Sequence, residues 1–128
     1  MADIKEITNR WLARNTKAKG VLACGVRYAD ASTFNQSSSS DFSAAALDHS
    51  WNSVAGMFHF LNQHQNDVDQ MCWNFENHLL HCVVRHDDTC LGIFTPKGPE
   101  AYDSTAVTRM ISEFKSLRGG EKGSRPAF

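Results

Sequence analysis

The sequence predicts a single α+β domain (an α/β fold in the broad sense) whose elements follow the order α-β-β-α-β-β-β-α. Apolar residues recur at helical spacing in three stretches, and β-rich or alternating runs occupy five others. The chain has 128 residues, which is enough for one compact core and too few for two. We therefore expect one domain over residues 1–117. Residues 118–128 contain little apolar surface, so we expect them to form a flexible tail.

The composition is typical of a globular protein. Hydrophobic residues make up 41% of the chain and charged residues 21%. The formal charge is −1 and the basic residues are spread along the chain, which argues against a nucleic-acid-binding protein. No apolar run approaches the roughly 20 residues that span a bilayer, and the first residues include acidic ones where a secretory signal is basic and then apolar. These features predict a cytoplasmic protein that does not insert into a membrane.

Two helices with narrow apolar faces are expected towards the two ends of the chain. The first runs from about Asp3 to Arg14, and Asp3 and Glu6 have the spacing of a capping box. The last follows a cap at Asp103 or Ser104. Its apolar face consists of Val107, Met110, Ile111, Phe114 and Leu117. Each helix should cover one surface and face water elsewhere.

Two strands are expected between the first and the middle helix. The run from Val21 to Tyr28 is mostly apolar, as in an interior strand that is buried on both faces. A turn at Asp30 leads into a shorter, more polar strand from Ser32 to Gln36, which ends in a loop of serines. The two strands should form a hairpin with a weak second arm.

The middle helix, expected from about Ala44 to Gln65, has a broader apolar surface than the other two. Its apolar residues cover an arc of roughly 220° on a helical wheel. They form one row of Leu47, Trp51, Val54, Phe58 and Leu61, and a second row of Ala46, Met57 and Phe60. One sheet face cannot cover such an arc, so we expect the surplus to pack against a second copy or a partner. The alternative is that the aromatic residues of this helix all fill the core.

Three further strands are expected as a meander. They run from Met71 to Glu76, from His78 to Arg85 and from Thr89 to Thr95, with a tight turn at Glu76 and Asn77. In the first of them, Met71, Trp73 and Phe75 alternate with the other residues, and the strand has no proline or lysine. If it lies at the edge of the sheet and nothing covers it, its backbone can pair with a strand of another chain. Its apolar side chains are expected to face the core, which leaves the backbone edge for pairing.

Several of these features together resemble the roadblock family, the dynein-light-chain-like domains related to longin folds. They are the helix followed by Gly20, the strand from Val21 to Tyr28 that turns at Asp30, and the strand Thr89 to Phe94 before a closing helix. The resemblance implies a five-stranded antiparallel sheet with the two terminal helices on one face and the middle helix on the other. Roadblock domains typically dimerise through their middle helices and third strands, and many are scaffolds or regulators of Ras-like small GTPases.

The sequence therefore predicts a non-enzymatic interaction domain that forms a homodimer and binds or regulates a Ras-like small GTPase. A heterodimer is a further possibility. We expect no cofactor, no metal and no catalytic residue, and no phosphate-binding loop of the G-x-x-x-x-G-K-[ST] type is present. The residues assigned to the dimer or partner interface are Leu47, Trp51, Val54, Met57, Phe58, Phe60, Met71, Cys72, Trp73, Asn74 and Phe75.

The alternative is a ligand-sensing or metal- or thiol-dependent domain that uses the meander. Histidine and cysteine are typical zinc ligands and thiol-enzyme residues. The meander contains Cys72, His78, His81, Cys82, His86 and Cys90. However, His78 and Cys82 should point to one face of their strand and His81 to the other, so no four of these residues are expected to converge. We interpret the cysteines as small apolar packing residues.

Overall fold

The computed structural model describes residues 3–64, 68–98 and 100–118. The helices and strands are α1 (Ile4–Asn15), β1 (Ala23–Arg27), β2 (Thr33–Ser37), α2 (Ala44–Gln63), β3 (Gln70–Asn74), β4 (His78–Val84), β5 (Cys90–Pro96) and α3 (Ser104–Ser116). Their order is the predicted one, and each element lies within about two residues of its expected place at most ends. The predicted tail lies outside the described residues except for its first residue, Arg118.

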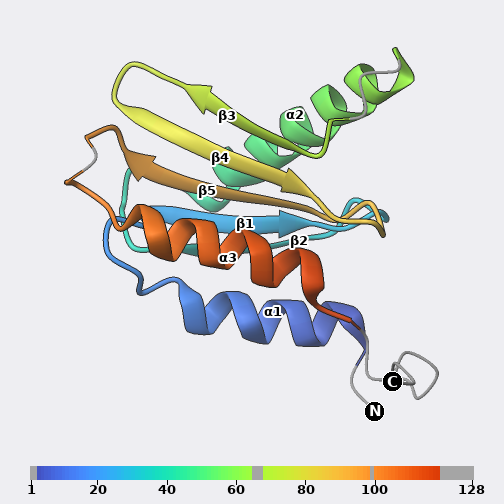
Figure 1. Cartoon of the computed structure of the whole chain (residues 1–128), viewed down its shortest axis with the longest axis horizontal. Coiled ribbons are helices and arrows are strands. Elements are labelled where there is room, and N and C mark those ends of the chain that lie inside the picture. Colours follow the sequence, from blue (N-terminus) through green and yellow to red (C-terminus); the bar gives the residue numbers. More distant parts are fainter. Residues whose placement is uncertain (1–2, 65–67, 99, 119–128) are drawn as a thin grey trace.

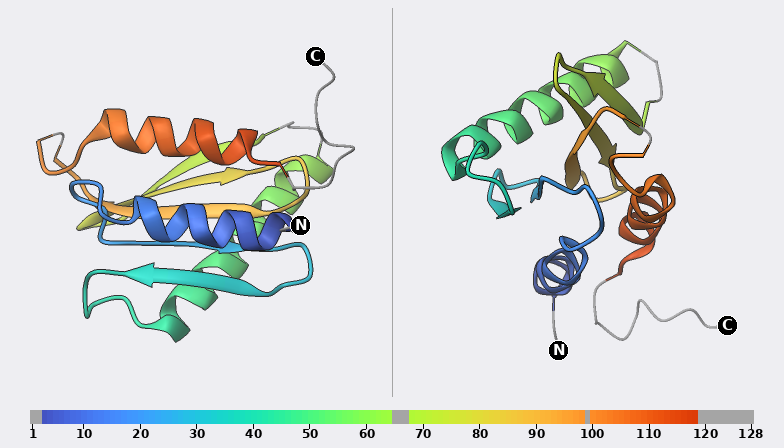
Figure 2. Two further views of the ribbon diagram at one scale, coloured as in Figure 1. Left: turned by 90° about the horizontal axis from the view of Figure 1, so that it is seen from below. Right: turned by 90° about the vertical axis from the view of Figure 1, so that its left-hand side faces the viewer.

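All strands belong to one antiparallel sheet with the order β2-β1-β5-β4-β3. The terminal helices α1 and α3 cover one face of this sheet, and α2 covers the other (Figures 1 and 2). This confirms the predicted fold class. The central strand is β5, which lies between β1 and β4, and β2 and β3 lie at the two edges of the sheet.

Side-chain caps fix where the helices begin. The carboxylate of Asp3 accepts a hydrogen bond from the Glu6 N–H (2.8 Å), and Asp103 does the same for the Ala106 N–H (3.1 Å). The Ser43 hydroxyl accepts from the N–H of Ala46 at the start of α2 (3.2 Å). Each cap satisfies a backbone donor that the first turn of a helix leaves without a partner.

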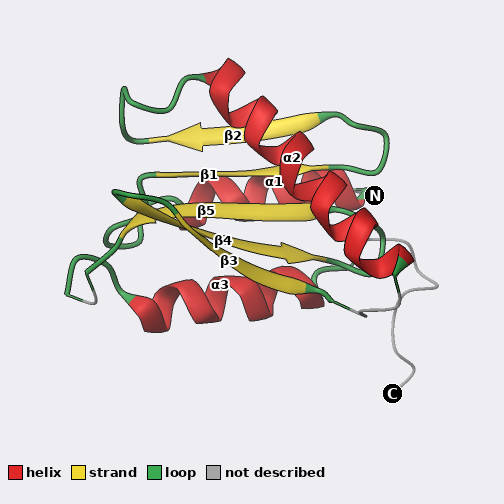
Figure 3. Cartoon of the chain, turned by 90° about the horizontal axis from the view of Figure 1, so that it is seen from above, coloured by secondary structure: helices red, strands yellow, loops and turns green. Residues whose placement is uncertain are grey.

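The sheet separates two apolar cores. The α1 and α3 side contains a cluster that includes Trp11, Ile93 and Phe114, and the α2 side contains a cluster that includes Trp51 and Phe94. Figure 3 shows that α2 crosses the sheet diagonally, so it does not cover every strand equally. The corner of the sheet at β3 therefore has less helix above it than the centre.

Candidate interaction surface

One row of α2 side chains packs entirely within the chain. Leu47, Trp51, Val54 and Phe58, which we call the inner row, are between 0% and 3% exposed. They belong to the core cluster between α2 and the sheet. All four are among the residues that the sequence assigns to the interface. The structure places them in the domain's own core, because α2 turns this row towards the sheet.

Trp51 is seated in a slot that two glycines create. Gly25 of β1 and Gly92 of β5 are paired across neighbouring strands, and the Trp51 indole lies over both. A Cβ atom on either glycine would overlap the indole ring. The indole N–H also donates to Oδ1 of Asn35 on β2 (2.6 Å). The position of α2 on the sheet is thus set by one side chain that contacts three strands.

A polar network continues from this slot to the edge of α2. Oδ1 of Asp48 accepts hydrogen bonds from the Asn35 amide (2.8 Å) and from the Thr33 hydroxyl (2.8 Å). These two donors stabilise the carboxylate and hold the pKa of Asp48 below its ordinary value. The network anchors α2 to β2, the edge strand at the opposite end of the sheet from β3.

A second row of α2 faces away from the core. It consists of Ser53, Gly56, Met57 and Phe60, and we call it the outer row. A Cβ atom on Gly56 would have no neighbour within 4 Å. Met57 is 40% exposed, Phe60 54% and Phe75, at the end of β3, 43%; among the described residues they are the exposed large hydrophobic side chains. All three were in the predicted interface.

The edge strand β3 has a neighbour on one side only within the described part of the chain, namely β4. Met71 and Trp73 are half-buried and pack against the core cluster under α2. Cys72 and Asn74 are exposed. The side chains of β3 therefore contribute partly to the core, while its outer backbone edge lies open.

The hydrogen-bond pattern between β3 and β4 shows which backbone groups point outwards. The Phe75 N–H donates to the His78 carbonyl (2.9 Å), and the Val84 N–H donates to the Asp69 carbonyl (2.9 Å). Hydrogen-bonded pairs alternate along an antiparallel ladder, so the odd-numbered residues of β3 bond to β4. The even-numbered residues direct their N–H and C=O groups to the open edge. They are Gln70, Cys72 and Asn74.

The structure brings one cysteine and one histidine of the meander together. Cys72 and His81 are paired across β3 and β4, and Cys72 Sγ lies 3.9 Å from His81 Nδ1. His81 Nε2 lies 2.9 Å from Oγ1 of the buried Thr95. Burial lowers the pKa of His81 and raises that of Cys72. The strand pattern places His81 and its neighbour Cys82 on opposite faces, and the pairing of His81 with Cys72 was not among the predictions.

The other histidines and cysteines of the meander lie apart. His78 packs against the ring of Phe42 on the α2 side (5.3 Å between centroids). Cys82 and Cys90 are buried, and burial raises the pKa of the Cys90 thiol to about 11. In residues 3–64, 68–98 and 100–118, no three His, Cys, Asp or Glu side chains are placed to hold a metal ion.

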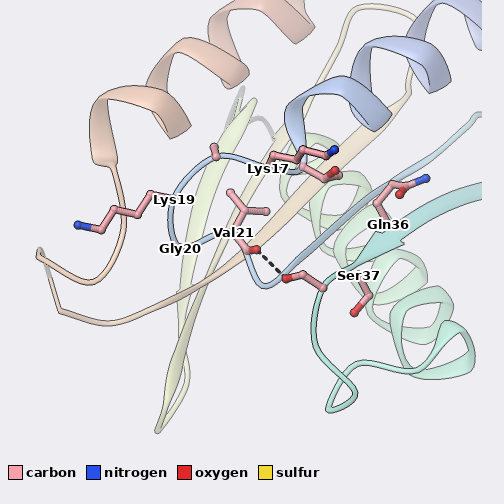
Figure 4. A pocket seen from close by; sticks show the side chains of 9 residues that line it. Lys17, Lys19, Gly20, Val21, Gln36 and Ser37 are labelled. Carbon is pink, nitrogen blue, oxygen red and sulfur yellow. Dashed lines mark hydrogen bonds between the residues drawn. The ribbon is translucent and has the colours of Figure 1, made fainter.

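A hollow of about 450 Å³ lies between the loop that follows α1 and the end of β2. Residues 16–21 and 36–38 line it. Figure 4 shows that Lys19 extends away from the other labelled side chains, and Ser38 Oγ donates to the Val21 carbonyl (3.1 Å). The charged groups of this hollow do not converge on a common point, so we do not assign it a ligand.

No protein-family model matches the sequence, and no curated protein is similar to it in sequence. Solved structures with a similar arrangement include the gliding protein MglB from Thermus thermophilus, with a TM-score of 0.68 and 11% identity over 88% of each chain. MglB from Myxococcus xanthus has a TM-score of 0.64 and 11% identity over 84% of each chain. A Roadblock/LC7 domain from Streptomyces avermitilis has a TM-score of 0.59 and 13% identity, over 81% of this chain and 87% of that one.

The chain has a roadblock-like fold. At these identities the similarity is one of fold. In this roadblock-like domain the predicted interface residues fall into two groups: the buried inner row, and a set with at least partial exposure. The second set consists of Met57, Phe60, Met71, Cys72, Trp73, Asn74 and Phe75. Across the ranges that the structure describes, no helix is both long and apolar enough to span a membrane.

Proposed function

We propose that this roadblock-like domain is an interaction module, without catalytic activity of its own, that forms a homodimer through β3 and the outer row of α2. The open edge of β3 is the observation that carries the proposal. Its outward N–H and C=O groups lie on a strand without proline or lysine. Met57, Phe60 and Phe75 supply exposed apolar surface on the neighbouring elements.

A second copy of the chain is the partner that matches this edge best. Two identical edges pair antiparallel about a twofold axis, which makes the same residues contact each other on both sides. An axis perpendicular to the sheet joins the two sheets and keeps both α2 helices on one face. The exposed apolar side chains of α2 and the half-buried Met71 and Trp73 then lie on the same face of the dimer.

The dimer can be tested by proline substitution at the edge. Asn74→Pro removes an outward N–H and places a ring where the second strand would pair, while the hydrogen bonds to β4 are retained. The parent chain should be a dimer by size exclusion with light scattering. Asn74→Pro should raise its dissociation constant at least about tenfold, a loss of about 1.4 kcal/mol of association free energy.

Ser37→Pro on the opposite edge is the matched control. Tyr28 N–H donates to the Ser32 carbonyl and Ser38 N–H to the Leu22 carbonyl, so the N–H of Ser37 points outwards from β2. This variant should remain a dimer. Circular dichroism checks that both variants are folded, and a folded Asn74→Pro variant that dimerises like the parent would contradict the proposal.

We further propose that the dimer binds and regulates a Ras-like small GTPase in the cytoplasm. The support is the resemblance to the roadblock family, many of whose members act on such GTPases. Because the sequence has no phosphate-binding loop of its own, the nucleotide would belong to the partner. Purified Ras-like GTPases from the same organism, loaded with GDP or with a non-hydrolysable GTP analogue, provide the test. Equal binding of the two forms would argue against a regulatory role.

A further inference from the structure

The sheet has a second open edge, on β2. Figure 3 shows β2 at the rim of the sheet, and within the described part of the chain its only paired neighbour is β1. Tyr28 N–H donates to the Ser32 carbonyl (2.8 Å), so the hydrogen-bonded pairs with β1 fall on the even-numbered residues of β2. The backbone groups of Thr33, Asn35 and Ser37 therefore point outwards. The strand contains no proline and no charged residue that would oppose pairing with a further strand.

The side chains of β2 differ between the two faces of this edge. Thr33 and Asn35 point to the α2 side, where both donate hydrogen bonds to Oδ1 of Asp48. Phe34 lies on the opposite face and is half-buried against the core cluster of α1 and α3. A strand added to β2 alternates in the same way, so one of its faces lies beside Asp48 and the other beside Phe34.

Asp48 has a carboxylate oxygen to spare at this edge. Both hydrogen bonds go to Oδ1, and Oδ2 has no hydrogen bond or ion pair with any residue that the structure describes. The two donors lower the pKa of Asp48, so its carboxylate is ionised at neutral pH. The helix α2 contains no other acidic residue and no lysine or arginine. A negative charge therefore stands beside the outward backbone groups of Thr33 and Asn35.

A second copy of the chain is a poor match for this edge. Two β2 edges that pair about a twofold axis bring their Asp48 carboxylates to the same face of the joined sheet, and like charges oppose such pairing. The β3 edge of a second copy offers no cation, since the stretch from Asp69 to Glu76 contains two acidic residues and no lysine or arginine. The edge therefore fits a strand of a different protein that supplies a basic side chain.

We propose that the β2 edge binds an extended segment of a partner protein by strand addition, and that a lysine or arginine of this segment pairs with Asp48. The segment carries polar and basic side chains on the Asp48 face and apolar ones on the Phe34 face, at alternate positions. The outward backbone groups of Thr33, Asn35 and Ser37 supply the affinity, and Asp48 supplies the preference for a basic residue. The site needs one chain only, so it does not depend on the proposed dimer.

The probe is a short blocked peptide in which threonine and valine alternate and an arginine replaces the central threonine. Titrated into the full isotope-labelled chain, one peptide per chain should bind, shift the amide signals of Thr33, Asn35 and Ser37, and slow their hydrogen exchange. The amide signals of Cys72 and Asn74 on the β3 edge should stay in place. Binding that does not saturate by about 1 mM peptide, or shifts centred on β3, would overturn the inference.

Ser37→Pro tests the backbone of the edge. It removes one outward N–H and places a ring where the peptide would pair, so the dissociation constant of the peptide should rise at least about tenfold. Asn74→Pro makes the same change at the opposite edge and should bind the peptide as the parent does. Circular dichroism checks that both variants are folded. Equal affinities of the parent and folded Ser37→Pro would overturn strand addition at β2.

A second peptide, in which glutamate replaces the central arginine, tests the charge of Asp48. The parent should bind the arginine peptide at least about threefold more tightly, as expected of an exposed ion pair. In Asp48→Asn this preference should shrink to less than about twofold, because the neutral side chain keeps an acceptor for Thr33 and Asn35 but no charge. The same preference in the parent and in Asp48→Asn, or none in the parent, would overturn the assigned chemistry of the partner.

Light scattering separates this site from self-association. If Ser37→Pro has a lower molar mass than the parent, a second copy occupies the β2 edge and the inference is overturned. A parent chain that is a monomer but binds the arginine peptide at β2 would overturn the proposed dimer and leave this site standing. A dimer that does not bind the peptide would do the reverse.

Discussion

The inner and outer rows of α2 are carried by one helix, yet they have opposite environments. The inner row is almost completely buried, and its Trp51 fills the slot over Gly25 and Gly92. The outer row leaves Met57 and Phe60 exposed beside Gly56, which has open space around it. Apolar character alone therefore does not distinguish core from surface on this helix. The shape of the sheet beneath it does, because the paired glycines admit one large ring at one point.

The largest effect is expected from Trp51→Ala in the inner row. Removing the indole leaves a cavity over both glycines and leaves Asn35 without its donor, so the free energy of unfolding should fall by about 3–5 kcal/mol. Urea denaturation measures this change. Both variants are made in the Asn74→Pro background, so that dissociation of a dimer does not contribute to the measured free energy of unfolding. Phe60→Ala in the outer row is the control and should cost less than about 1 kcal/mol. Similar losses for the two variants would contradict the assignment of the rows.

The same contrast can be tested with two glycines. Gly92→Ala should destabilise the fold by about 1–3 kcal/mol, because its Cβ atom would overlap the Trp51 ring. Gly56→Ala should instead stabilise the fold by about 0.5–1 kcal/mol, because alanine is the better helix former and no atom obstructs its Cβ. Both glycine variants are made in the Asn74→Pro background. Thermal or urea unfolding of both variants gives the signs. Two changes of the same sign would argue against the slot.

The outer row should matter for association more than for folding. Met57→Ser combined with Phe60→Ser should raise the dimer dissociation constant at least about tenfold, or about 1.4 kcal/mol. The far-ultraviolet circular dichroism spectrum should not change. Sedimentation or light scattering over a range of concentrations measures the dissociation constant. An unchanged constant would restrict the interface to the β3 edge.

The smallest effect concerns Asp48, which joins α2 to β2. Its folded pKa lies below the ordinary value of 3.8, so its contribution to stability is present above that pH and is lost as the pH falls through the folded pKa. Asp48→Asn cannot titrate. The stability difference between the parent and Asp48→Asn should therefore shrink as the pH falls below about 3.8. Denaturation curves between neutral pH and about pH 2 test this, and parallel pH profiles would contradict it.

The fold could be predicted largely because local patterns agreed with it. The caps at Asp3 and Asp103, the alternation in β3 and the narrow faces of α1 and α3 all depend on residues close together in the sequence. The candidate site could be predicted only in part. The open edge of β3 and the exposed Met57 and Phe60 were identified, but the inner row was assigned to the interface as well.

The contact between Cys72 and His81 could have been found from the sequence. A tight turn at Glu76 and Asn77 places Phe75 opposite His78, and counting back along the two strands places Cys72 opposite His81. The sequence predicts the turn, and the register that pairs Cys72 with His81 follows from the length of that turn. The signal was therefore present in the spacing, not in a motif.

The sequence by itself determined the elements, their order and the apolar character of α2. These properties depend on periodicity and capping, which act within a few residues. Only the tertiary structure decided which row of α2 is core, because the deciding slot is formed by Gly25 and Gly92 on strands far apart in the chain. It also decided which backbone groups of β3 point outwards, because that depends on which pairs bond to β4.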